Sequence, residues 1–173
     1  RHPLAVVASN LGGQVASTRP AWTHETLPTW AASTGLLDGP LHHLAPALHE
    51  LFARDRSPVE DRTIRWCMEN YVPLVVTPSA AALTVRFEHM VAAPSDALAR
   101  VGDCVDLDLA PGLRDFDRPS STDWLTGRGG RDGTRSDRRD GWRDRLDAAD
   151  CDAGTAILDV VGLRELVESD ERA

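Results

Sequence analysis

Helix start signals recur along the chain, and one short run between them predicts a strand. Pro3 predicts a helix that continues to about Leu11, because proline is well tolerated in a first helical turn. The sequence Ser-Pro-Val-Glu at 57–60 combines an N-cap residue, a first-turn proline and a following glutamate, and predicts a helix over 58–71. The run Leu-Thr-Val-Arg-Phe at 83–87 predicts a strand. Much helix with a single internal strand is typical of an α/β protein.

Further helices are expected on both sides of this run. Leucines recur at spacings of three and four from Leu41 to Leu51, and Pro46 is expected to divide that stripe into shorter pieces. The sequence Pro-Ser-Asp at 94–96 predicts a helix through about Cys104. A last helix follows Asp147, with Ala153, Ile157, Val160 and Val161 on one face and Gly162 as its stop. We therefore expect one domain over 1–173, with a flexible Arg/Gly-rich loop at 127–141.

Charge and composition exclude several classes of function. The net charge of −8 argues against a nucleic-acid partner, and no run of 18 apolar residues is present to cross a membrane. All 19 basic residues are arginine, so a Walker-type phosphate loop and lysine Schiff-base chemistry are both excluded. Within 127–145, seven arginines stand against four aspartates. A local positive patch on an acidic protein suits a small anionic ligand.

The three cysteines lie far apart and form no C-x-x-C motif. Their odd number and wide spacing do not predict a disulfide framework or a zinc site, so no metal is expected. We expect reduced, mostly buried thiols, which favours a cytoplasmic location.

Three segments are candidates for chemistry, and each also has a plain structural explanation. Arg1 would lie at the mouth of the first helix with Ser9 two turns along, where a helix N-terminus attracts anions. The strand predicted at 83–87 is followed directly by Glu88 and His89, and ligands gather at the carboxyl ends of strands. The arm around Trp142 combines glycines and arginines. The structural alternatives, in the same order, are an arginine on the protein surface, a strand-end glutamate that pairs with a nearby arginine, and an exposed basic linker.

The order of these segments resembles the sulfotransferases that use 3′-phosphoadenosine 5′-phosphosulfate (PAPS). That family has a segment of the form R-x-P-x-x-V-x-x-S, and here Arg1, Pro3, Val6 and Ser9 are in register. The resemblance implies that Arg1 and Ser9 hold the 3′-phosphate of the cofactor. A family strand that ends R-Y-E-D-L is similar to Arg-Phe-Glu-His-Met at 86–90, which implies that Phe87 touches the adenine.

A third element near the C-terminus matches the family more loosely. The family loop R-K-G-x-x-G-x-W-K wraps the 3′-phosphate, and with Trp142 in register Arg135 and Arg143 fall on its two ends. Residues 136–140 depart from the pattern at three positions, namely Ser136, Asp137 and Asp140. The segment at 118–122, Arg-Pro-Ser-Ser-Thr, is similar to one that often precedes this loop in bacterial members.

The resemblance implies an α/β, P-loop-like sulfotransferase fold that is mostly helical here, with few parallel strands. It implies an enzyme that transfers a sulfonate group from PAPS to a hydroxyl or amine of a small-molecule or carbohydrate acceptor, without a metal. The segment 12–60, with Trp22 and Trp30, is the candidate for acceptor contact. The family's 5′-phosphosulfate loop and general base lie upstream of the Arg–Ser element, so no catalytic residue is assigned.

Two alternatives to an active sulfotransferase stay open at this point. One is a truncated, catalytically inactive homologue, and the other is a helical protein-interaction domain that docks through the arginine-rich arm. The sequence gives neither the acceptor nor the oligomeric state.

Overall fold

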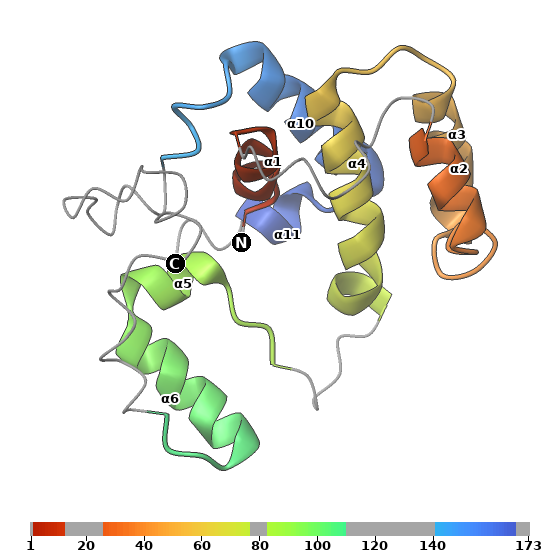
Figure 1. Cartoon of the computed structure of the whole chain (residues 1–173). Coiled ribbons are helices and arrows are strands. Elements are labelled where there is room, and N and C mark those ends of the chain that lie inside the picture. The colour runs from red at the N-terminus through yellow and green to blue at the C-terminus, as the bar shows by residue number, and fades with distance from the viewer. Residues whose placement is uncertain (1, 13–25, 77–82, 110–140, 169–173) are drawn as a thin grey trace. The chain divides into compact units, whose positions relative to one another are not determined.

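The computed structural model describes residues 2–12, 26–76, 83–109 and 141–168. Every regular element within these ranges is a helix, and no strand forms in them (Figure 1). The expected α/β fold with parallel strands is therefore wrong for the described part of the chain.

The chain divides into two compact units, which we describe separately. The α5–α6 unit contains Arg1 and residues 80–142. The core unit contains residues 2–79 and 143–173.

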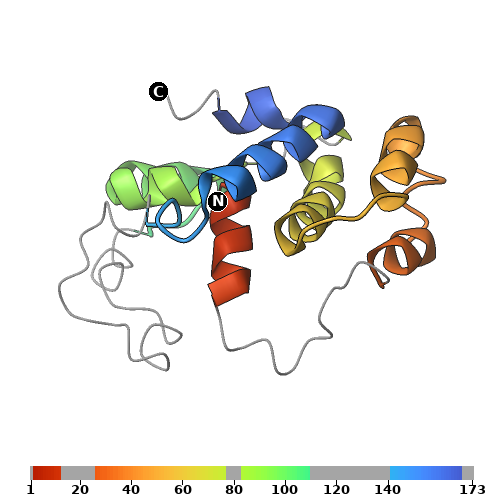
Figure 2. The same cartoon turned by 90° about the horizontal axis from the view of Figure 1, so that it is seen from above.

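The described part of the core unit consists of α-helices and two short helical turns. Its α-helices are α1 Pro3–Gly12, α2 Thr26–Ser33, α3 Ala45–Phe52, α4 Pro58–Tyr71, α10 Ala148–Val161 and α11 Arg164–Glu168. A 3-10 turn, η2 His42–Leu44, precedes α3, and a π-helical turn, η3 Val72–Val76, follows α4. Helix α4 packs against both α1 and α10, and α2 and α3 lie on its other side (Figures 1 and 2).

Helix α4 forms over the residues predicted for it. The Ser57 N–H donates to Glu60 Oε2 at 2.7 Å, and the Glu60 N–H donates to Ser57 Oγ at 3.2 Å. This reciprocal pair satisfies two donors that a helix N-terminus otherwise leaves without partners. Ile64, Cys67 and Met68 are buried as expected, so the local start signal and the apolar face agree.

The predicted helices at both ends of the chain are also confirmed. Helix α1 begins at Pro3, and Asp147 caps α10 by accepting a hydrogen bond from the Asp150 N–H at 2.8 Å. Gly162 ends α10 with a φ of +73°, a left-handed conformation that glycine adopts without strain. Pro46 lies in the first turn of α3 and separates it from η2, as expected.

The buried face of α10 differs from the predicted one. Gly154 and Leu158 are buried with Ile157 and Val161, whereas Val160 is exposed. The core that this face joins lies between α2, α3, α4 and α10. Its buried residues are Leu27, Ala31, Leu37, Leu41, Leu48, Leu51, Ile64, Cys67, Met68, Tyr71, Ile157, Leu158, Val161 and Leu163.

The described part of the α5–α6 unit contains two helices, α5 Phe87–Ala92 and α6 Pro94–Val105. The predicted strand at 83–87 is wrong, because Phe87 begins α5. Arg86 keeps an extended backbone, with φ −85° and ψ 138°, but its carbonyl accepts a hydrogen bond from the Met90 N–H at 3.0 Å. Strand backbone groups need a neighbouring strand as partner, and the described residues contain none.

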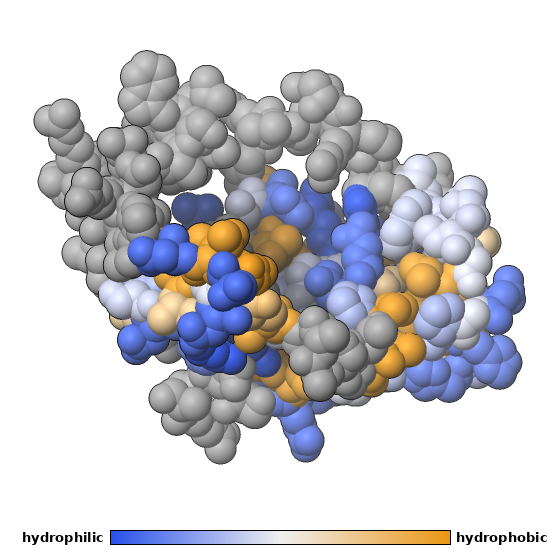
Figure 3. Space-filling view, turned by 90° about the horizontal axis from the view of Figure 1, so that it is seen from below, coloured by the Kyte–Doolittle hydropathy of each residue, from blue (hydrophilic) through white to orange (hydrophobic). Residues whose placement is uncertain are grey.

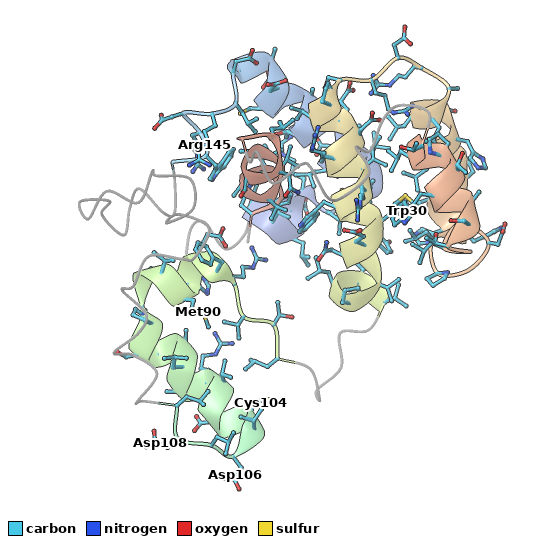
Figure 4. All side chains as sticks on the ribbon, viewed as in Figure 1. Trp30, Met90, Cys104, Asp106, Asp108 and Arg145 are labelled. Atoms are coloured by element: carbon cyan, nitrogen blue, oxygen red, sulfur yellow. The ribbon has the colours of Figure 1, made fainter. Side chains whose placement is uncertain are left out.

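Helix α6 forms where Pro94 predicts it. It ends at Val105, and the next residue, Asp106, adopts a left-handed conformation with φ 54°. Figure 4 shows the extent of this unit, with Met90 on α5, Cys104 on α6 and Asp106 beyond its end.

Within the described ranges, no helix combines the length and the apolar character that crossing a membrane requires. Figure 3 shows hydrophobic residues, in orange, gathered in clusters beside groups of hydrophilic residues, in blue, on the face that it draws. Trp22 and residues 127–140 of the expected flexible loop lie outside the described residues.

Candidate functional site

The six residues assigned from the family resemblance are distributed over both units. Arg1 and Arg135 lie outside the described residues. Ser9 is exposed on α1 in the core unit, and Arg143 is exposed just before α10 in the same unit. Phe87, which begins α5, is half-buried, and Trp142 is buried; both belong to the α5–α6 unit.

Ser9 is exposed on helix α1, whereas the apolar side of this helix is buried. Leu4, Ala5, Val7 and Ala8 are buried, whereas the side chains that follow from Ser9 to Leu11 are exposed. At the other end of the helix the Leu4 N–H donates to His2 Nδ1 at 3.2 Å, so an imidazole caps α1. The Ser9 hydroxyl is therefore accessible on a helix whose apolar side is fixed.

The guanidinium of Arg143 affects the pKa of Cys151, which lies near the start of α10. Burial and the carboxylates of Asp150 and Asp152 raise the pKa of Cys151, and the nearby guanidinium of Arg143 partly offsets them. The other two thiols differ in exposure: Cys67 is buried, which raises its pKa to about 12, and Cys104 is exposed. The prediction that the thiols are mostly buried is therefore confirmed only for Cys67.

A small pocket lies within the α5–α6 unit, at the segment that resembles the family's R-Y-E-D-L element. Its volume is about 120 Å³. The lining comes from the residues before α5, from α5 itself and from the first turns of α6: Val85, Arg86, His89, Ala93, Asp96, Ala97 and Arg100.

The pocket is basic although the whole chain is acidic. Its lining includes two arginines, Arg86 and Arg100, and one aspartate, Asp96. Asp96 and Arg100 are four residues apart on α6 and so share a helical face, whereas Arg86 precedes α5 in an extended conformation. This arrangement can bind a small anion.

The sequence pattern located this segment but not all of its residues. Phe87 was the residue assigned to a ligand, yet it does not line the pocket, whereas its neighbours Arg86 and His89 do. Arg100 was not singled out at all. The available signal was its spacing, because Ala93, Ala97 and Arg100 follow one face of the predicted helix.

A second charged cluster, at the start of α4, has a structural role. Arg56 Nε lies 2.6 Å from Asp61 Oδ1, and the side chains of these residues are 0% and 4% exposed. Arg54 Nη2 lies 2.6 Å from Glu60 Oε1. All four charges join the segment before α4 to its first turn, so the cluster fixes how the chain enters the helix.

The ionisation of Glu60 makes the stabilising effect of this charged cluster depend on pH. Burial alone would raise the pKa of Glu60, but hydrogen bonds from Ser57 and the charge of Arg54 outweigh it and hold the pKa below the ordinary value of 4.5. A carboxylate whose folded pKa is depressed stabilises the fold above its unfolded pKa. That contribution is lost as the pH falls from about 4.5 through the lower folded value.

We therefore expect the stability of the core unit to fall on acidification below pH 4.5, and Glu60→Gln to reduce that dependence. At pH 7 the variant should lose at most about 1 kcal/mol, because the glutamine amide oxygen can still accept from the Ser57 N–H but no longer forms the ion pair with Arg54. Urea unfolding followed by circular dichroism at pH 7 and pH 3.5 measures both quantities. An identical pH dependence in the variant and the wild type would contradict this assignment of Glu60.

Within the described ranges, no group of three or more His, Cys, Asp or Glu side chains is placed to hold a metal ion. Comparison with known proteins gives no match, whether to a family model, to a curated protein or to a solved structure.

Proposed function

We propose that this chain binds PAPS and serves the transfer of its sulfonate group to a hydroxyl or amine of a small-molecule or carbohydrate acceptor. The observation that carries the proposal is the basic pocket of the α5–α6 unit. It lies at the segment 86–94, where the family resemblance expects the nucleotide, and Arg86 and Arg100 make it suitable for an anion.

The positions of the other two family-like segments are a second observation that supports the proposal. The helix that the Arg–Ser element requires does begin at Pro3, and it leaves Ser9 exposed for contact with a ligand. Arg143 is exposed as well, as expected for a residue that closes over a phosphate.

The proposed reaction is an in-line displacement at sulfur. A base removes the proton of the acceptor, and the acceptor oxygen or nitrogen forms a bond to sulfur. The bond between sulfur and the bridging oxygen breaks, and 3′-phosphoadenosine 5′-phosphate leaves. Arg1, Ser9 and Arg143 would hold its 3′-phosphate, and positioning of this kind is a large part of catalysis in related phosphoryl transfer. The three free thiols are the reason to propose a cytoplasmic setting, where thiols stay reduced.

Calorimetric titration of the intact chain with 3′-phosphoadenosine 5′-phosphate tests this function. We expect saturable binding, weaker binding of adenosine 5′-phosphate, and a loss of about tenfold or more in affinity for Arg1→Ala, because a charge-assisted contact to phosphate is removed. Arg164→Ala is the matched control, since Arg164 is an exposed arginine outside the motifs and outside the basic segment 127–145. Absence of binding to the wild type, or equal losses in the two variants, would contradict the proposal.

The helical fold also favours a second candidate function, a protein-interaction domain. Within the described ranges the chain has helices only, and Val105 and Leu107 at the end of α6 are 52% and 61% exposed. The same titration discriminates the two candidates. An interaction domain predicts no heat with the nucleotide, whereas the sulfotransferase proposal requires it.

A further inference from the structure

We draw no further inference here: the strongest candidate, the exposed apolar surface patch of Val105 and Leu107 at the end of α6, flanked by the exposed residues Asp103 and Asp106, carries no proposal because nothing in the structure shows what covers it.

Discussion

Arg56→Met should destabilise the core unit by about 3 kcal/mol, because it leaves the buried carboxylate of Asp61 without its cation. Arg56 also donates to the Leu51 carbonyl at 2.8 Å, so the segment between α3 and α4 loses a backbone contact as well. Methionine is chosen because it retains most of the apolar stem of the side chain; the contact of the Arg56 guanidinium carbon with the Phe52 ring, 5.5 Å from the ring centroid, is lost as well. Urea unfolding of the intact chain, followed at 222 nm, gives the change in the free energy of unfolding.

An exposed arginine provides the matched control for this substitution. Arg164 forms ion pairs with Asp159 at 2.9 Å and Glu168 at 2.8 Å, but its side chain is 44% exposed. Exposed pairs contribute about 0–1 kcal/mol, so Arg164→Met should have a much smaller effect. The double variant Arg56→Met/Asp61→Leu should recover most of the lost stability, because it removes both buried charges. Equal losses for the two single variants would show that burial of the Arg56–Asp61 pair has no energetic consequence.

Gly154→Val should destabilise the core unit by about 2 kcal/mol through overpacking. A side chain at Gly154 would collide with the Leu4 methyl group Cδ2 and would approach Thr63 Oγ1 at 3.4 Å. Leu4 is 3% exposed, so its side chain has little space into which it can move. The helix propensity of valine exceeds that of glycine, which offsets only a part of this cost.

A double-variant cycle shows whether the contact with Leu4 is the cause. Leu4→Ala creates space at the site, so Gly154→Val should cost less in that background than in the wild type, by about 1 kcal/mol or more. Ala156→Val, at an exposed position of the same helix, controls for helix propensity and should cost about 0.5 kcal/mol. Strictly additive losses in the cycle would rule out a steric conflict between these two residues.

The candidate site was only partly predictable from the sequence. The segment 85–94 was identified because its residues combine charge with a change of local pattern, and the pocket does lie there. Arg100 and the two alanines were missed, since their common position depends on how α6 packs beside α5. A pattern in one helix indicates which residues share a face, but it does not indicate what that face meets.

The sequence by itself determined where α1, α4 and α10 begin and where α10 ends. Pro3, the capping residues Ser57 and Asp147, and the stop at Gly162 act through hydrogen bonds and backbone preferences within one helical turn. Such interactions need no distant partner. This is why α1, α4 and α10 agree with the prediction.

Only the tertiary structure decided the features that require a second element. The run at 83–87 has β-forming residues, but a strand needs a neighbour for its N–H and C=O groups, and α5 begins at Phe87 instead. The pairing of Arg56 with Asp61, the contact of Gly154 with Leu4 and the basic pocket of the α5–α6 unit likewise depend on packing. Burial changes the energy of charges and contacts far more than sequence proximity does, and burial is a property of the folded chain.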